Sequence, residues 1–397
     1  MAKKEQVPAI RFQGFADPWE QRKLDEFVSF FSGLTYSPAD IRPAGTLVLR
    51  SSNVKDGEVV DADNVYVDPT VVNSENVRDG DIIVVVRNGS RALIGKHAEI
   101  KGFKPNTVIG AFMTGIRSEH PSFLNALLNT PRFDKEVEMN MGATINQITG
   151  YMFSKMEFMV PSSDEQDIIG DYFKKLDNLI TLHQRKYDKL VAIKRSMLEK
   201  MFPREGSRFP EIRFAGFTDP WEQRKFSDFV LRESVFQASS SEYPSVEYED
   251  VVAEEGRLNK DIRQKETQKT GIVFDGTQVL YGKLRPYLHN WLNPDFTGVA
   301  VGDWWVLRPV GADKKFLYRL IQTQQFDEVA NQSSGSKMPR ADWNLVSNTE
   351  FIIPSSLDEQ RQIAGTFDDL DNLITLHQRK LEKLQAIKRS MLEKMFV

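Results

Sequence analysis

Two segments of the chain carry apolar residues in a regular spacing of three and four positions. The first lies within residues 161–205 and the second within residues 354–397. A mostly apolar seam with a mean period of about 3.5 residues is typical of helices that pack as a coiled coil. We therefore predict two long helices, the first running from about residue 164 to residue 202. The seam positions are Phe173, Leu176, Ile180, His183, Tyr187, Leu190, Lys194, Met197 and Met201 in the first segment, and Phe367, Leu370, Ile374, His377, Leu381, Leu384, Lys388, Met391 and Met395 in the second.

Each predicted helix follows a Pro-Ser-Ser sequence that fits a capping box. In such a box a serine oxygen and a later side chain bond the free backbone N–H groups of the first turn. Ser163 with Gln166 fits the first helix, and Ser356 with Glu359 fits the second. The second start carries one extra residue, Leu357, which predicts a shifted junction.

The remainder of the chain consists of short apolar runs broken by Gly, Asn, Asp and Pro. Residues 81–86 and 271–274 predict strands, while residues 123–128 and 315–321 predict short helices. This mixture is typical of compact α+β domains. We therefore divide the chain into an α+β domain (1–160), a long helix (161–205), a second α+β domain (206–353) and a second long helix (354–397).

Two parts of the chain occur twice. Residues 7–28 match residues 209–230 at 15 of 22 positions, and residues 176–202 match residues 370–396 at 24 of 27 positions. The blocks between them, 29–160 and 231–353, show no comparable identity. Gene conversion within the repeated frame, together with drift in the blocks, is one explanation. Two exchangeable readers on a symmetric frame is the other, and it is favoured because drift alone should blur the frame too.

Two related units are most simply arranged about an approximate two-fold axis. Such an axis would make the two helices antiparallel and place the variable domains at opposite ends. A helix over residues 164–202 would span roughly 58 Å. On B-form DNA that length corresponds to about 17 base pairs, so the helices are interpreted as a spacer of fixed length.

Composition limits the classes of protein without choosing among them. The 397 residues suffice for two or three domains, and the net charge of −4 argues against a protein that coats DNA nonspecifically. Cysteine is absent, so disulfides and thiolate metal sites are not expected. The sequence contains no long apolar run and no signal peptide, and we expect a cytoplasmic protein.

Several loops combine basic, amide and small residues in a way that suits DNA. Arg suits guanine edges and Asn or Gln suits adenine edges, while Ser and Lys favour phosphates. Taken singly, each loop also fits an ordinary surface loop. Gly142 and Gly335, however, stand at the same distance before Pro161 and Pro354. The candidates are Arg87, Asn88, Ser90, Arg91, Lys96, Thr144, Asn146 and Gln147 in the first domain, and Lys283, Arg285, Tyr287, His289, Asn290, Ser334, Ser336, Lys337 and Arg340 in the second.

No catalytic or metal site is predicted from the sequence. The stretch 89–97 resembles a phosphate-binding loop, but it has one residue too many between its glycines and ends on His97 instead of Ser or Thr. We interpret His183 and His377 as polar seam residues that set the register, because no second ligand lies four residues on. The basic pairs at 194–195 and 388–389 fit a solvated helix face or a partner surface, with phosphate contact as the alternative.

Together these features resemble the specificity subunits of type I restriction-modification enzymes. The resemblance covers nearly the whole chain and is carried by the twin helices, their Pro-Ser-Ser starts, the duplicated Asp-Pro-Trp-Glu-Gln-Arg-Lys at 17–23 and 219–225, and the segment 281–288. It implies a non-catalytic subunit with two target-recognition domains, at 1–160 and 206–353, which read the halves of a split, asymmetric DNA site.

The resemblance also implies partners. Two methylation subunits would bring S-adenosylmethionine to adenine N6, and two motor and nuclease subunits would use ATP and magnesium. No cofactor is expected in this chain. A coiled-coil scaffold without sequence reading, and a stand-alone enzyme acting on DNA, remain as alternatives.

Overall fold

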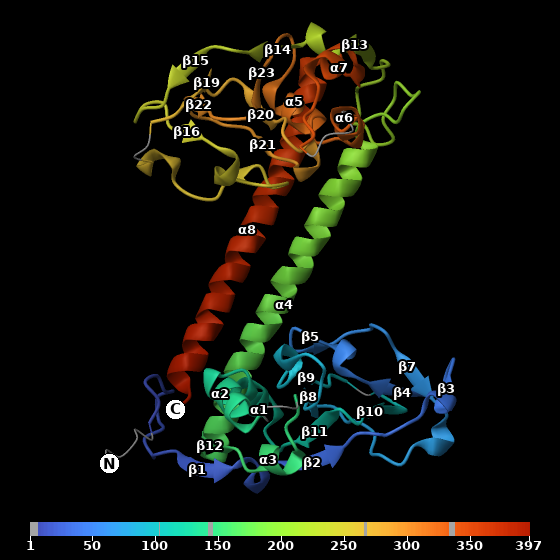
Figure 1. The fold of residues 1–397 in the computed structure, drawn as a ribbon, viewed down its shortest axis with the longest axis vertical. Helices are drawn as coiled ribbons and strands as arrows, with labels where there is room; N and C mark the ends of the chain where they lie inside the picture. The colour runs from blue at the N-terminus through green and yellow to red at the C-terminus, as the bar shows by residue number, and fades with distance from the viewer. Residues whose placement is uncertain (1–6, 103, 142–145, 266–267, 333–337) are drawn as a thin grey trace. The chain divides into compact units, whose positions relative to one another are not determined.

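The computed structural model describes residues 7–102, 104–141, 146–265, 268–332 and 338–397 (Figure 1). The chain forms two compact units. The first unit comprises residues 1–184 and 379–397, and the second comprises residues 185–378. Each unit therefore holds one variable block, the first half of the long helix that follows it, and the last half of the other long helix.

The first unit is a mixed α and β structure that ends in a long helix. Its helices are α1 (Pro121–Leu128), α2 (Pro131–Asn140), α3 (Gly150–Ser154) and the start of α4 (Ser163–Lys200). Its strands are β1 (Glu20–Lys23), β2 (Ser29–Ser32), β3 (Ile41–Arg42), β4 (Thr46–Leu49), β5 (Val54–Lys55), β6 (Glu58–Val59), β7 (Val65–Val67), β8 (Ile82–Val85), β9 (His97–Glu99), β10 (Thr107–Ile109), β11 (Met113–Arg117) and β12 (Glu157–Val160).

The second unit repeats this order of elements. Its helices are α5 (Lys314–Leu320), α6 (Gln324–Ala330), α7 (Trp343–Asn348) and the start of α8 (Leu357–Met395). Its strands are β13 (Glu222–Lys225), β14 (Val230–Glu233), β15 (Phe236–Ala238), β16 (Ser245–Val246), β17 (Val251–Val252), β18 (Arg257–Leu258), β19 (Thr270–Phe274), β20 (Val279–Gly282), β21 (Trp291–Leu292), β22 (Gly298–Ala300), β23 (Trp304–Pro309) and β24 (Glu350–Ile353). The strands and short helices predicted in both blocks are confirmed as β8, β19, α1 and α5.

The variable blocks share a topology that their sequences do not reveal. One antiparallel sheet has the strand order β2-β11-β8-β9 in the first unit and β14-β23-β20-β21 in the second. A parallel pair, β4 with β10 and β16 with β22, also occurs in both. The units differ in how this second sheet grows, because β7 and β3 extend it from β4, whereas β19 and β15 extend it from β22. The blocks are therefore related folds with separately elaborated edges.

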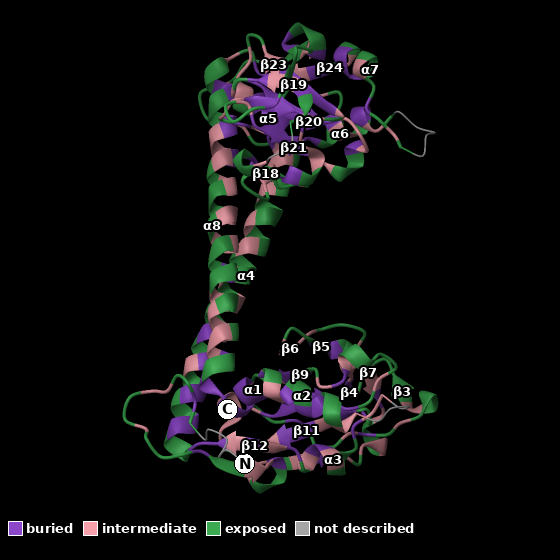
Figure 2. Ribbon diagram, turned by 60° about the vertical axis from the view of Figure 1, so that its left-hand side comes forward, coloured by how far each residue is buried: buried purple, intermediate pink, exposed green. Residues whose placement is uncertain are grey.

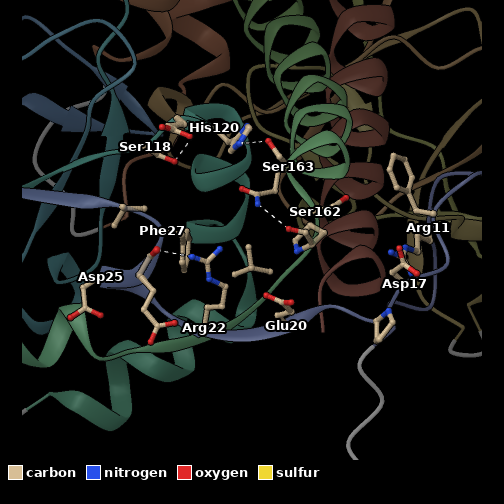
Figure 3. Close-up of a pocket in the computed structure, with 18 of the residues that line it drawn as sticks. Arg11, Asp17, Glu20, Arg22, Asp25, Phe27, Ser118, His120, Ser162 and Ser163 are labelled. Carbon is tan, nitrogen blue, oxygen red and sulfur yellow. Dashed lines mark hydrogen bonds between the residues drawn. The ribbon is translucent and has the colours of Figure 1, made fainter.

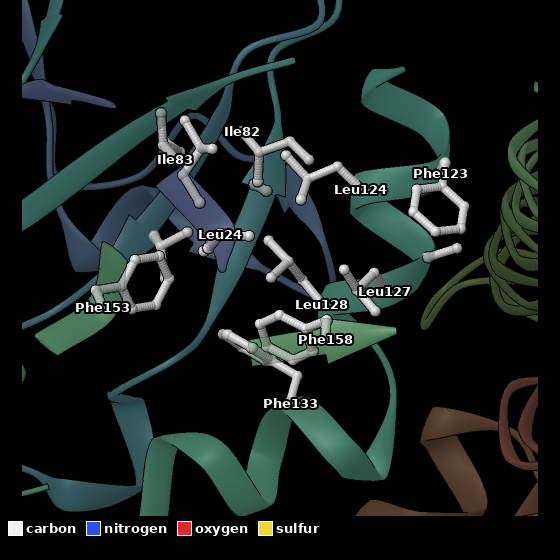
Figure 4. Close-up of a cluster of buried hydrophobic side chains, with 14 of the residues drawn as sticks. Leu24, Ile82, Ile83, Phe123, Leu124, Leu127, Leu128, Phe133, Phe153 and Phe158 are labelled. Carbon is white, nitrogen blue, oxygen red and sulfur yellow. The ribbon is translucent and has the colours of Figure 1, made fainter. Parts of the chain in front are cut away.

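Each unit is held by its own apolar core (Figure 2). In the first unit the apolar faces of β8 and α1 meet aromatic side chains from α2, α3 and β12 (Figure 4). The side chains of this cluster include Leu24, Ile82, Ile83, Phe123, Leu124, Leu127, Leu128, Phe133, Phe153 and Phe158.

The end of a long helix completes each core. Phe396, just beyond α8, stacks on Phe123 at 5.7 Å in the first unit, and Phe202, just beyond α4, stacks on Phe316 at 5.5 Å in the second. For this reason each compact unit includes part of both long helices. The sequence analysis instead predicted each long helix as a segment of its own.

Within each unit the two helix segments run in opposite directions. In the first unit Asp177 of α4 pairs with Lys388 of α8 at 2.6 Å, and in the second Lys194 pairs with Asp371 at 2.7 Å. Every predicted seam residue is buried or half-buried. The two seam lysines therefore pair with carboxylates inside their own unit.

A buried glutamate ties the repeated segment to each helix start. Glu165 accepts two hydrogen bonds from Arg11, at 2.7 and 2.8 Å, and one from the Trp19 indole at 3.2 Å. Glu359 accepts the same set from Arg213 and Trp221, at 2.7, 2.9 and 3.1 Å. This network explains why the Arg and Trp of the repeat and the Glu of the helix start occur together.

The predicted capping boxes are only partly correct. Ser356 caps the second helix by accepting the N–H of Glu359 at 3.3 Å, but the Glu359 carboxylate bonds Arg213 instead of reaching back. Ser163 is the first residue inside α4 and is not its N-cap. The extra Leu357 lies between the proline and the glutamate, so Ser356 corresponds to Ser162 and not to Ser163, and the glutamate network is unchanged.

Candidate nucleic-acid interface

Two of the loops predicted to bind DNA meet in the first unit. A bridge between Arg87 and Gln147 joins the end of β8 to the segment before α3. The N–H of Asn88 donates to the carbonyl of Asn146 at 3.2 Å beside this bridge. Four of the predicted residues, far apart in sequence, are therefore neighbours.

The second unit joins the corresponding loops in the same way. A bridge pairs Leu284 with Arg340, and the N–H of Arg285 donates to the carbonyl of Pro339 at 2.7 Å. Arg340 and Gln147 stand at the same distance before the proline of their helix start. The matched offset noted in the sequence thus corresponds to a matched backbone position.

A third loop completes each of these junctions. The carbonyl of Phe112, just before β11, accepts the N–H of Val86 at 3.0 Å and that of Arg87 at 3.2 Å. The carbonyl of Asp303, just before β23, accepts the N–H of Lys283 at 2.9 Å. We call the two sites the first loop junction (Arg87, Asn88, Phe112, Asn146, Gln147) and the second loop junction (Lys283, Leu284, Arg285, Asp303, Arg340). Phe112 and Asp303 are equivalent in backbone and unlike in side chain.

The first loop junction presents amides and one stacked arginine. The Arg87 guanidinium lies over the Phe112 ring at 4.9 Å, and the ring is 54% exposed. Asn88 donates to the Ser51 hydroxyl at 3.0 Å, and Asn146 donates to the Gly89 carbonyl at 3.0 Å. These hydrogen bonds hold the amides in place beside an exposed cation.

The second loop junction is built on charge. The Asp303 carboxylate accepts a hydrogen bond from Arg340 at 3.0 Å and lies 3.5 Å from the Lys283 ammonium. The hydrogen bond from Arg340 is the largest cause of a lowered pKa for Asp303. The Tyr248 hydroxyl accepts the N–H of Leu284 at 2.9 Å and donates to the Asp303 carbonyl at 2.7 Å, and burial raises its pKa. Tyr248 therefore joins two of the three loops.

A strained turn projects beside the second loop junction. Arg285 and His289 have φ of 48° and 52° on either side of the turn Pro286–Leu288. The left-handed region costs a residue with a Cβ about 1–2 kcal/mol. The turn exposes Tyr287 and Leu288, which are 52% and 41% accessible. A rigid backbone that presents apolar tips beside basic groups has the chemistry suited to contacting DNA bases.

Comparison with known proteins bears on these junctions. The type I restriction modification DNA specificity domain matches residues 16–192 and 246–386, which is most of the chain. The chain belongs to this family. Each matched region contains one of the two loop junctions, so both junctions lie within the part of the chain that matches the family.

Individual relatives agree with this assignment. The chain is 27% identical over 171 residues to the type I restriction enzyme StySPI specificity subunit of Salmonella potsdam, covering 41% of the chain and 36% of the relative. It is 22% identical over 272 residues to the MjaVIII specificity subunit of Methanocaldococcus jannaschii, covering 63% and 64%. These matches span about a third to just under two thirds of the relatives.

A solved structure shows the same fold. The type I restriction-modification S subunit from M. genitalium superposes with a TM-score of 0.62 and covers 98% of this chain and 99% of that chain. The two sequences are only 14% identical, so the likeness concerns the fold alone.

The remaining candidates of this specificity-domain chain fall into different surroundings. Ser90 and Arg91 are exposed on the loop beyond Asn88, whereas Lys96 lies at the other end of that loop. Thr144, Ser334, Ser336 and Lys337 lie outside the described residues.

Of the two candidates next to β21, one is buried and the other is held by neighbouring side chains. Asn290 is only 8% exposed and its carbonyl accepts the N–H of Gly282 at 2.7 Å, so its side chain is not a surface contact. His289 lies 2.9 Å from Asp327 and stacks on Trp291 at 5.3 Å, so its ring supports the turn. Sequence proximity could not separate these supports from the exposed tip.

The stretch that resembles a phosphate-binding loop is organised around a buried histidine. His97 lies 3.1 Å from the Gly95 carbonyl through Nδ1, and its Nε2 lies 3.0 Å from the Asn129 amide. Burial lowers the pKa of His97 to about 4, which keeps the ring neutral at ordinary pH. A buried, neutral imidazole cannot take the place of the Ser or Thr that holds magnesium beside a bound phosphate.

A hollow of about 960 Å³ lies at the helix start of the first unit (Figure 3). On its wall the Ser163 hydroxyl lies 2.9 Å from His120 Nε2, and His120 Nδ1 lies 2.6 Å from Asp167. The order resembles a catalytic triad, but Asp167 is 66% exposed, whereas the acid of a triad is buried. Leu357 occupies the place of Ser163 in the second unit. We interpret the chain of bonds as a tie between α1 and α4.

Across the described residues, no cluster of three or more His, Asp or Glu side chains could hold a metal ion. Within the same part of the chain, no helix combines the length and apolarity needed to cross a membrane. Sequence reasoning also missed Phe112, Asp303 and Tyr248. Phe112 stands in a largely apolar stretch and Asp303 in a turn, so neither carries a sequence signal for DNA contact.

Proposed function

We propose that this chain is the DNA-reading subunit of a type I restriction-modification complex, and that each loop junction reads one half of a split, asymmetric target. The main observation that supports this proposal is that the two junctions share their backbone hydrogen bonds but not their side chains. One scaffold with two sets of donors and acceptors is suited to two different short sequences.

We propose that α4 and α8 form an antiparallel coiled-coil spacer with pseudo-two-fold symmetry. The opposite direction of the segments within each unit and their matched lysine–aspartate pairs support this arrangement. The 38 residues of α4 would span roughly 57 Å. That length would set the unread gap between the two half-sites.

Two equivalent apolar patches support a scaffold for two copies of one partner. Leu179 and Leu182 on α4, and Leu373 and Leu376 on α8, are each exposed by nearly half. An exposed apolar pair that recurs at equivalent positions suits two identical partners. We assign these patches to two methylation subunits, which would carry S-adenosylmethionine to adenine N6. Two motor and nuclease subunits would use ATP and magnesium, and the chain itself would catalyse nothing. The complex would act in the cytoplasm.

The patches offer a direct test of this scaffold role. The double variant Leu179→Asp/Leu182→Asp should reduce the number of methylation subunits recovered with the tagged chain from two to one. The matched variant Leu373→Asp/Leu376→Asp should do the same, and combining both should leave none. Recovery of both copies with either variant would contradict the assignment.

A genome-wide map of modified adenine, in source cells with and without this gene, tests the function. We expect deletion to remove one split motif, made of two short halves around a fixed gap. A map that does not change would contradict the reading role in that cell and would favour a coiled-coil scaffold that binds only proteins.

A further inference from the structure

The position held by Phe112 and Asp303 orients a different arginine in each unit. Both residues offer a backbone carbonyl to the strand-end loop and so occupy the same place. The Phe112 ring supports Arg87, whereas the Asp303 carboxylate bonds Arg340. The turn position therefore contacts an arginine of the strand-end loop in the first unit and an arginine of the loop before the long helix in the second, where Leu284 stands in place of Arg87.

In the first unit the orientation comes from stacking. The Arg87 guanidinium lies 4.9 Å from the centre of the Phe112 ring, and both side chains are exposed. A guanidinium stacked on a ring keeps its N–H donors in one plane, along its edges. Such an edge matches O6 and N7 of guanine in the major groove.

In the second unit the orientation comes from an ion pair. Arg340 donates from Nε and Nη2 to the Asp303 carboxylate, at 3.2 and 3.0 Å, and about half of its side chain is exposed. Two bonds to one carboxylate fix the plane of the guanidinium. The plane is thus fixed by a carboxylate in this junction and by an aromatic ring in the other.

Resting on the proposed function, we propose that positions 112 and 303 determine specificity. Phe112 positions Arg87, and Asp303 positions Arg340, each to bond a guanine in the major groove of its own half-site. In this proposal Arg87 and Arg340 contact bases directly, whereas Phe112 and Asp303 act through them.

The test selects DNA from a pool of random-sequence duplexes. The tagged full chain is recovered from its own cells with the subunits that accompany it, and the duplexes it retains are sequenced. We expect Arg87→Ala to lower the preference for guanine at one position of one half-site by about 5- to 150-fold, without changing the other half. Arg78→Ala, which removes an exposed arginine of the same unit that is not among the DNA-binding candidates, is the matched control and should leave that position unchanged.

The positioning residues are tested by the base preference at a single position, which a general loss of stability would not change selectively. Phe112→Leu should weaken the preference for guanine at the same position as Arg87→Ala does. Phe112→Tyr should keep that preference, because tyrosine retains the aromatic ring. Asp303→Asn and Arg340→Ala should relax one guanine in the other half-site.

Three results would overturn the inference. Uniform weakening by Arg87→Ala across all sequences would assign that residue to phosphate. Relaxation of different positions by Phe112→Leu and Arg87→Ala would separate the pair, and unchanged preferences would exclude both. If the unaltered chain selects no split motif, the proposed function itself fails. If it selects one that these variants leave intact, only this inference fails.

Discussion

The loop junctions and the helix starts of the two units differ in how much of their chemistry they share. At the loop junctions the hydrogen bonds between the three loops recur, yet Phe112 stands where the other unit has Asp303, and Asn88 where it has Arg285. At the helix starts, in contrast, backbone and side chains both recur around a buried glutamate. The repeated frame uses the same side-chain contacts in both units, whereas the loop junctions use different side chains. This difference separates the parts that stabilise the fold from the parts that would read DNA.

The largest expected effect tests whether the two frames are equivalent. Glu165→Ala should destabilise the first unit by about 3–5 kcal/mol, because it leaves the nearly buried Arg11 without its partner. Glu359→Ala should cost the second unit a similar amount through Arg213. Hydrogen exchange measured unit by unit reports each loss. A large loss in one unit only would contradict the equivalence of the frames.

A smaller effect should separate the two units by pH. His97 in β9 corresponds to Trp291 in β21, since both pair with the central strand at the same place. Burial lowers the pKa of His97 from its ordinary value of 6.5 to about 4 in the folded chain, so between these pH values only the unfolded chain binds the proton. The stability that depends on a neutral His97 is therefore complete above about pH 6.5 and falls as the pH drops towards 4.

Through His97, the free energy of unfolding of the first unit should be about 2 kcal/mol lower at pH 5 than at neutral pH. Urea unfolding of the wild type and of His97→Gln at both pH values measures it, since other titrating groups cancel in the difference. An identical pH dependence of the two proteins would show that His97 does not titrate in this way.

The smallest effect concerns single bases. If Arg285 contacts guanine, Arg285→Ala should cost about 1–3 kcal/mol and relax one position of one half-site. Asn88→Ala, at the equivalent place in the first unit, should relax a position in the other half only. Selection from random duplexes distinguishes the two, and a uniform loss for Arg285→Ala would place that residue on phosphate.

The sequence predicted the frame well because repetition and periodicity are local signals. The long helices, their seams, and the strands at β8 and β19 follow from spacing alone. The equivalence of the two loops that precede the helix starts was anticipated by the matched offset of Gly142 and Gly335 before Pro161 and Pro354. Their pairing with the strand-end loops was not anticipated.

Other features depend on tertiary structure and had no local signal. Asn290 looked like a polar loop residue, but the fold buries it beside Gly282. Phe112 and Asp303 acquire their importance from loops that are distant in sequence. The shared topology of the blocks was also hidden, because many different apolar residues satisfy the same sheet.

Exchange of residues 29–160 tests the central claim most directly. This block contains the whole first loop junction and leaves the repeated frame and the second junction intact. The measurement is the modified-adenine map of cells that carry the chain with this block taken from another member of the family. The account predicts that one half of the split motif changes while the other half and the gap stay the same. A change in both halves would contradict two independent readers on one frame.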